Sequence, residues 1–245
     1  MESRSSLKIC SFNIRNGDAD DGSNSWPHRA DTVVQLLQKI DADIFGLQEV
    51  MDYQLDHILH CLPDYFPIGV GRIDGRREGE FAPILYRKSR LGIGGMGWFW
   101  LSEDPTFPGS QSWNTACERI CTWADFGDFQ VYNTHLDHIS AEAQFKGTQL
   151  VLSRMSNKPT IFMGDLNVLP DDPTIKAIQE QGFQDAINPI SQSTFHNWGT
   201  EEYGQIDYIF VRGLEASDPK IHTAQLNGRD ASDHYAVSTR VNYKR

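Results

Sequence analysis

The sequence has few cysteines and no paired C-x-x-C motif. Four cysteines occur in 245 residues, and they are Cys10, Cys61, Cys117 and Cys121. Cys117 and Cys121 alone make a poor zinc site, because a structural zinc ion needs a second pair of ligands. Without a second pair in the pattern, we predict that all four are free thiols.

Long hydrophobic runs are also absent. No stretch approaches the roughly 20 apolar residues of a membrane-spanning helix. The opening "MESRSSLKICSFNIR" has no continuous apolar segment that could act as a secretory signal. We therefore expect no membrane span and an intracellular, cytoplasmic protein. Because no linker rich in Gly, Ser or Pro interrupts the chain, we also expect one domain over residues 1–245.

Positive charge is scarce, and several catalytic motifs are missing. Lys and Arg total 22 against 33 Asp and Glu, giving a formal net charge of −11. This charge repels nucleic-acid backbones at long range, so duplex DNA is not an expected partner. The chain lacks a G-x-S-x-G elbow and a glycine-rich phosphate loop, which disfavours covalent acyl transfer and P-loop chemistry. No pattern indicates a protein partner.

The order of apolar patterns predicts an α/β or α+β domain with mixed sheets and helical cover. Helices are expected at 25–40, 52–62, within 140–156 and at 173–181, where apolar residues recur at helical spacing. Strand-like runs are expected at 7–15, 42–50, 81–88, 97–102, 120–126, 128–137, 159–165, 206–211 and 234–241. The early strand–helix repeats and the later antiparallel texture together favour stacked layers.

Polar residues recur where these strands end. They are Asn13, Glu49, His135, Asp137, Asp165, Asn167, Asp207, Asp233 and His234. Carboxylates and amides are costly to bury unless they are paired or bound to a metal, so their repetition predicts one shared site. Hard oxygen donors of this kind suit Mg²⁺ or Mn²⁺, which are often shared with substrate phosphates. Hydrolysis of a phosphate ester fits this set best.

The ordered motifs resemble a known superfamily. "SFNIR", "GLQEV", "NTHLDH", "GDLNVLPDD", "IDYIF" and "SDHYAV" together resemble the endonuclease/exonuclease/phosphatase superfamily of metal-dependent phosphoesterases, over residues 8–240. The resemblance implies a four-layer α/β sandwich, with two mixed sheets face to face and helices outside. "NTHLDH" is closer to the deadenylase and inositol-phosphatase branches than to the abasic-site nucleases, and other segments resemble a compact branch of unassigned substrate.

Carried over by motif, the resemblance implies a role for each residue. Asn13 and Glu49 would bind or position the metal, with Asp233 close by. Asp165 would be the general base, and Asn167 would orient the water and the phosphate. His234 would contact the scissile phosphate while Asp207 holds its imidazole, and His135 would be a second grip on the phosphate.

Structural roles remain open as alternatives for these residues. Glu49 and Asp165 could cap the helices that follow them, because carboxylates favour helix N-termini. Asn13 could be a turn residue, and His135 and His234 could form structural pairs with neighbouring carboxylates. His57 and His60 carry no motif and are read as surface or core histidines.

Further residues are candidates for substrate binding. These are Arg15, Trp26, Glu80, Arg119 and Asp137. A basic stretch from Arg72 to Arg90 is a second candidate grip for phosphate, with a solvated loop as the alternative. The favoured substrate is a phosphodiester in a small molecule or in single-stranded nucleic acid. The alternatives are a phosphomonoester of the sugar or inositol type, a DNA or RNA nuclease substrate, and an inactive binding protein.

Overall fold

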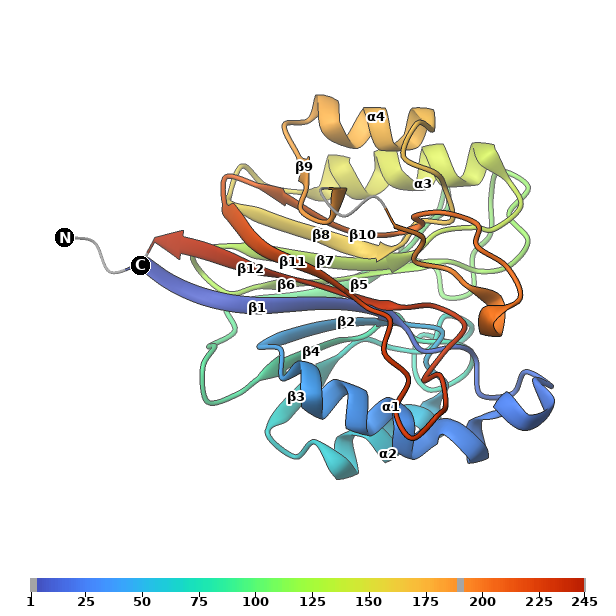
Figure 1. Ribbon diagram of the computed structural model, residues 1–245. Helices are drawn as coiled ribbons and strands as arrows, with labels where there is room; N and C mark the ends of the chain where they lie inside the picture. The colour runs from blue at the N-terminus through green and yellow to red at the C-terminus, as the bar shows by residue number, and fades with distance from the viewer. Residues whose placement is uncertain (1–3, 189–191, 245) are drawn as a thin grey trace.

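Two six-stranded mixed sheets lie face to face in the computed structural model, which describes residues 4–188 and 192–244. Helices α1 and α2 cover the outer face of one sheet, and α3 and α4 cover the outer face of the other (Figure 1). The order of layers is therefore helix, sheet, sheet, helix. This architecture is the four-layer α/β sandwich that the sequence resemblance implied.

The first sheet brings together the beginning and the end of the chain. Its strand order is β11-β12-β1-β2-β4-β3, with β1 parallel to β2 and the other neighbours antiparallel. The strands are β1 (Arg4–Asn13), β2 (Ile44–Gln48), β3 (Tyr65–Ile68), β4 (Ile84–Arg87), β11 (Glu215–His222) and β12 (Ala236–Lys244). The first three residues of the opening segment lie outside the described chain.

The second sheet uses the middle of the chain. Its order is β5-β6-β7-β8-β10-β9, with β7 parallel to β8 and the other neighbours antiparallel. The strands are β5 (Gly95–Trp100), β6 (Ile120–Asp125), β7 (Gln130–His135), β8 (Thr160–Asp165), β9 (Gln184–Asp185) and β10 (Asp207–Arg212). Each sheet thus holds one parallel pair at its centre.

The helices differ in how their first turns are capped. They are α1 (Trp26–Ile40), α2 (Asp52–Cys61), α3 (Ala141–Arg154) and α4 (Pro173–Glu180). The Ser140 side chain accepts the Ala143 amide at the start of α3, and Asp172 accepts the Thr174 amide at the start of α4. Such caps satisfy backbone donors that have no partner within the helix.

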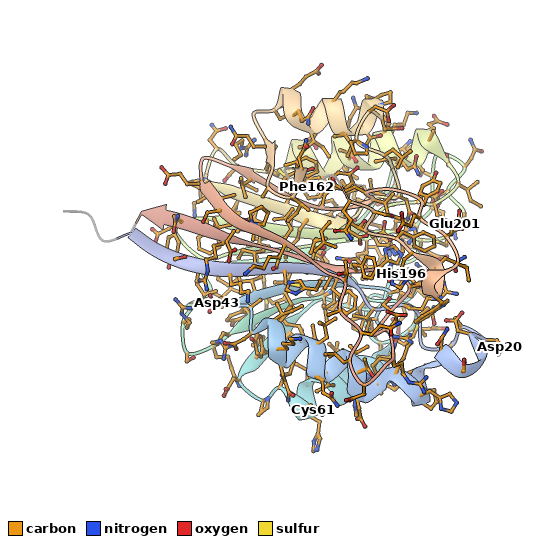
Figure 2. All side chains as sticks on the ribbon, viewed as in Figure 1. Asp20, Asp43, Cys61, Phe162, His196 and Glu201 are labelled. Carbon is orange, nitrogen blue, oxygen red and sulfur yellow. The ribbon has the colours of Figure 1, made fainter. Side chains whose placement is uncertain are left out.

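Alternating side chains divide the core into layers. On β8, Ile161 and Met163 pack between the two sheets, whereas Phe162 packs with α3 and α4 on the outer face (Figure 2). On β1, Ile9 faces the space between the sheets and Cys10 faces α1 and α2. Successive side chains of a strand point to opposite faces, so a strand between two apolar layers is apolar throughout.

Most expected elements are confirmed within a few residues, but β3, β9 and β11 carried no sequence signal. β11 (EASDPKIH) is an edge strand with mostly exposed or half-exposed residues, and its pairing with β12 is irregular between Ser217 and Lys220. A polar edge strand that contains a proline shows no apolar alternation. All four cysteines are free, as expected. Among the described residues, no helix has both the length and the hydropathy to cross a membrane.

Candidate active site

The polar strand ends meet at one edge of the two sheets. β7 and β8 are parallel and end level, with His135 opposite Asp165, and antiparallel β10 begins with Asp207 opposite the same Asp165. In the other sheet, β1 and β2 are parallel and in register, with Asn13 opposite Gln48. Parallel strands place their carboxyl ends at one edge, so distant motifs converge there.

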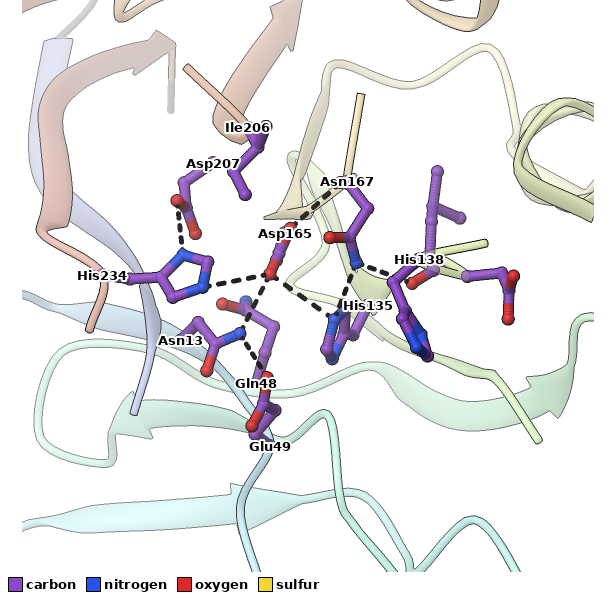
Figure 3. Close-up of polar contacts among 12 residues, drawn as sticks. Asn13, Gln48, Glu49, His135, His138, Asp165, Asn167, Ile206, Asp207 and His234 are labelled. Carbon is purple, nitrogen blue, oxygen red and sulfur yellow. Dashed lines mark hydrogen bonds and ion pairs between the residues drawn. The ribbon is translucent and has the colours of Figure 1, made fainter. Parts of the chain in front are cut away.

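Asp165 is the centre of this cluster. Its carboxylate is 1% exposed, and its Oδ2 accepts the Asn13 amide Nδ2 at 2.9 Å (Figure 3). The same oxygen lies 3.4 Å from His135 Nε2 and 3.7 Å from His234 Nε2. Burial raises the pKa of Asp165, partly offset by the positive charge of His234. A carboxyl with a raised pKa accepts a proton more readily than an exposed aspartate does.

Asn13 joins this carboxylate to Glu49. Its Nδ2 also donates to Glu49 Oε1 at 2.9 Å, and Glu49 Oε2 accepts the backbone amide of Asn16 at 2.8 Å. Although burial would raise the pKa of Glu49, these hydrogen bonds lower it below its usual value. Glu49 is therefore ionised, and Asn13 holds its carboxylate close to that of Asp165.

The backbone at these positions is unusual. Arg15 has φ of 61°, Glu49 has φ of 59° and Asn167 has φ of 53°. Asparagine tolerates this left-handed region, whereas it is uncommon for arginine and glutamate. Such conformations persist only where surrounding contacts impose them, and at Glu49 and Asn167 those contacts include the hydrogen bonds of the cluster.

His234 and Asp207 form a buried pair. The His234 Nδ1 lies 2.9 Å from Asp207 Oδ2, and Nε2 faces Asp165. Burial alone would lower the pKa of His234, but Asp207 and Asp165 raise it to about 10. The imidazole is therefore a cation at neutral pH, which suits contact with a phosphate oxygen.

His135 and Asn167 form the opposite side of the cluster. The side-chain Nδ2 of Asn167 lies 3.0 Å from His135 Nε2 and donates to the Leu136 carbonyl. The backbone amide of Asn167 donates to Asp165 Oδ1. Burial and the nearby guanidinium groups of Arg119 and Arg72 lower the pKa of His135 well below its ordinary value. His135 is therefore a neutral imidazole at neutral pH.

The donor set fits a divalent cation. Ligand atoms of Glu49, His135 and Asp165 lie within 4.8 Å of one another. Two converging carboxylates and an imidazole could hold a divalent cation, and a cation there would relieve the repulsion between the two carboxylates. Asp233, which the sequence grouped with Glu49, is not part of this set, and its Oδ2 lies 3.6 Å from Arg15 Nε.

A buried arginine ties together the loops that carry these residues. Arg29 is 1% exposed and donates to the backbone carbonyls of Ile14, Arg15, Asn24 and Ala231. Three of these carbonyls belong to the loop after β1 and to the loop before β12. Because charged hydrogen bonds are strong, Arg29 fixes both loops relative to α1.

The cluster forms one wall of a cavity of about 660 Å³. Glu49, His135, Asp165, Asn167, Asp233 and His234 line it, whereas Asn13 and Asp207 lie behind them. This volume is within the range of about 300–1,000 Å³ that is typical of small-molecule sites.

Some of the candidate substrate-binding residues line the cavity and others do not. Arg15, Glu80 and Arg119 line the cavity. Trp26 does not, because it is buried in the core beside His57. Asp137 is also outside the lining, and its two oxygens accept the backbone amides of Ala116 and Ser140. Trp26 therefore packs in the core, and Asp137 binds neighbouring backbone amides, rather than lining the cavity.

Several lining residues were missed by the sequence reasoning. They include Asn16, His138, Phe195, Asn197 and Tyr203. Asn16 and His138 adjoin the motifs "FNIR" and "NTHLDH", so proximity to a motif could have found them. The loop that carries Phe195, Asn197 and Tyr203 has no motif and no periodicity.

The geometry does not support helix capping by Glu49 and Asp165. Met51, not Glu49, occupies the N-cap of α2, and α4 begins only at Pro173 with Asp172 as its cap. Both carboxylates instead face Asn13.

Comparisons with known proteins give a consistent result. The model of the Endonuclease/Exonuclease/phosphatase family matches residues 10–234. An endonuclease/exonuclease/phosphatase structure from Bacteroides vulgatus is 30% identical, with a TM-score of 0.92 over 98% of this chain and 100% of that one. A mannosyl-6-phosphatase from Bacteroides thetaiotaomicron VPI-5482 is 31% identical, with a TM-score of 0.88 over 96% and 99%.

A curated viral relative is more distant. An uncharacterized protein of Acanthamoeba polyphaga mimivirus is 28% identical over 189 residues. The alignment covers 60% of this chain but only 27% of that protein, so the chain spans a small part of this relative's length.

Proposed function

This chain belongs to the endonuclease/exonuclease/phosphatase family, and on that premise we propose that it is a divalent-metal-dependent hydrolase of small phosphate esters. The observation that carries the proposal is the position of Asp165. Its buried carboxylate lies between two histidines and an asparagine at the wall of a cavity for a small molecule.

The proposed reaction is attack of water on phosphorus. Asp165 accepts a proton from the water, whose oxygen forms a new bond to phosphorus while the ester P–O bond breaks. The leaving oxygen departs with the bond electrons and takes a proton from solvent water. The imidazolium of His234 donates to a non-bridging oxygen, and Asp207 keeps that ring oriented.

A divalent cation would be held by Glu49 with His135 and Asp165, while Asn13 positions the carboxylates. When bound, such an ion supplies Lewis-acid stabilisation of the charge that develops on the phosphoryl group. Asn167 would orient the phosphate beside His135.

We propose a phosphomonoester of a sugar or a similar polyol as the first substrate class. The similarity to a mannosyl-6-phosphatase over almost the whole chain supports this class. A phosphodiester, which the sequence favoured, is the second candidate. The cavity volume of about 660 Å³ supports it, because this space accommodates a drug-sized ligand with two substituents.

A substrate screen tests the proposal. Purified protein with Mn²⁺ is assayed on p-nitrophenyl phosphate, bis-p-nitrophenyl phosphate, mannose 6-phosphate, short RNA and single-stranded DNA, with EDTA controls. We expect EDTA-sensitive turnover of the monoesters, and faster turnover of the diester would assign the second class. Turnover that persists in EDTA, or no turnover of any phosphate ester, would contradict the proposal.

A further inference from the structure

Among the described residues, no carboxylate forms an ion pair with the buried side chain of Arg119. It precedes β6, is 5% exposed, and lines the catalytic cavity. Within residues 4–188 and 192–244, its Nε and Nη1 have no hydrogen-bond acceptor, and its Nη2 is 3.0 Å from His138 Nδ1. Arginine is rarely buried without a partner, because an unsatisfied charged donor costs free energy. Two charged donors of Arg119 are therefore available to bind an anion.

The two carboxylates that line a small recess together with Arg119 already have other partners. Glu80 Oε2 accepts Arg72 Nη1 at 2.5 Å, and Glu80 Oε1 accepts Asn16 Nδ2 at 2.8 Å. Arg72 and Glu80 therefore cancel each other's charge, which leaves the charge of Arg119 in excess. Glu49 belongs to the metal-capable group, so a bound cation would remove it as a counter-charge for Arg119.

The residues that carry the unpaired nitrogens line one narrow recess. The recess has a volume of about 10 Å³ and shares Glu49, Arg72, Glu80, Arg119 and His135 with the main cavity. Besides the two atoms of Arg119, Arg72 Nε and His135 Nδ1 are buried without a partner in the described chain. A space of this size holds roughly one water or one oxygen atom.

We propose that Arg119, supported by Arg72, forms an anion-binding subsite that takes an oxygen of a phosphoryl group on the substrate. Guanidinium groups bind phosphate oxygens through strong charged hydrogen bonds. The oxygen has two sources: the reacting phosphate itself, or a second phosphate on the same substrate. The subsite rests on the proposed phosphoesterase function and specifies which substrates are held.

Binding of inorganic phosphate tests the subsite without turnover. Calorimetric titration at saturating Mg²⁺ compares the wild-type protein with Arg119→Met and with Arg77→Met as the matched control. Arg77 also carries one positive charge, but it pairs with Asp52 and Asp56 outside the cavity. Loss of a charged hydrogen bond of about 1.5–3 kcal/mol weakens binding by about 10- to 100-fold.

We expect that loss for Arg119→Met and an unchanged affinity for Arg77→Met. Equal phosphate affinity in the wild type and Arg119→Met would overturn the subsite, whether or not the protein hydrolyses esters in the screen. If Arg119→Met does not fold, Arg119→Lys replaces it, because lysine keeps the charge but loses the planar donors. An affinity loss of several-fold is then expected, and wild-type affinity would overturn the proposal.

Two substrates separate the sources of the bound oxygen. In a protein that hydrolyses both, kcat/KM is measured for a hexose monophosphate and a hexose bisphosphate. If Arg119→Met lowers kcat/KM equally for both substrates, the subsite binds an oxygen of the reacting phosphate. A larger decrease for the bisphosphate shows that the subsite binds the second phosphate. No penalty on either substrate would also overturn the subsite.

Discussion

Asp165 shows how burial prepares a single side chain for chemistry. Its carboxylate is excluded from water, which raises its pKa, yet it keeps hydrogen bonds from Asn13 and from the Asn167 backbone. Burial lowers the pKa of both flanking histidines. The carboxylates of Asp207 and Asp165 outweigh burial at His234 and raise its pKa, whereas the guanidinium groups of Arg119 and Arg72 lower the pKa of His135 further. One cation and one neutral imidazole therefore flank the proposed base.

Replacement of this carboxylate tests its role. We expect Asp165→Asn to lower kcat by about 10²- to 10⁴-fold, because asparagine cannot accept the proton of the attacking water. Affinity for Mn²⁺ should also fall, because Asp165 belongs to the proposed ligand set, but saturating Mn²⁺ should not restore kcat. Steady-state kinetics and metal titration measure the two effects. Asp185→Asn, at a half-buried position on β9, is the control. A wild-type kcat in Asp165→Asn would show that Asp165 is not the base.

At the residue scale, sequence reasoning reached the residues that belong to motifs. Asn13, Glu49 and Asp165 stand at strand ends, where a polar residue interrupts an apolar run and is easily recognised. Trp26 is a substrate-binding candidate because it follows the first motif in the sequence. Proximity in sequence, however, does not determine which way a helical side chain points. Its position in the helix turns it into the core.

At the scale of elements, the parallel pair β7–β8 positions two proposed catalytic groups. Thr134 pairs with Gly164, one residue before His135 and Asp165. Gly164 has φ of 149°, and a Cβ there would lie 1.9 Å from the Thr134 carbonyl oxygen. Only glycine allows the two backbones to approach so closely, because both the space and the backbone conformation exclude a side chain.

A methyl group at this position should disrupt the pair. We expect Gly164→Ala to lower the free energy of unfolding by about 3 kcal/mol or more, since the obstacle is backbone that cannot move aside. Gly92→Ala is the matched control, because no atom lies within 4 Å of its Cβ and we expect a change within about 0.5 kcal/mol. Urea unfolding measures both, and equal stability of the two variants would refute the close-approach argument.

The elements that sequence reasoning missed share a physical property. β11 is largely solvated, and the loop with Phe195 and Tyr203 holds only a short 3-10 helix, Asn197–Gly199, and isolated β-bridges at Phe195. Neither segment buries a periodic apolar face, so neither leaves a pattern in the sequence. The positions of such segments follow from tertiary packing, which no local pattern encodes.

At the scale of the whole molecule, buried histidines connect stability to pH. His222 lies in β11, and its Nε2 is 2.9 Å from Ser238 Oγ. Burial, together with the charges of Lys8, Lys220 and Lys39, lowers its pKa to about 4. The unfolded chain binds the proton more readily, so acidification favours unfolding below the ordinary histidine pKa of about 6.5.

The stability that His222 contributes should therefore be present above pH 6.5 and lost as the pH falls toward 4. Between pH 7.5 and pH 5, we expect the wild type to lose about 1 kcal/mol more than His222→Gln, after allowance for solvent screening. Denaturant unfolding at the two pH values gives this difference. Equal losses would show that His222 does not carry this pH dependence.

The proposed phosphoesterase activity requires a divalent cation beside Glu49 and Asp165, which come from opposite sheets. Calorimetric titration with Mn²⁺ tests this most directly, using the wild type, Glu49→Gln, and Glu180→Gln at the exposed end of α4 as a charge-matched control. If Glu49 holds the cation, Glu49→Gln weakens Mn²⁺ binding by at least about tenfold, while Glu180→Gln binds Mn²⁺ like the wild type. Wild-type Mn²⁺ affinity in Glu49→Gln would contradict it.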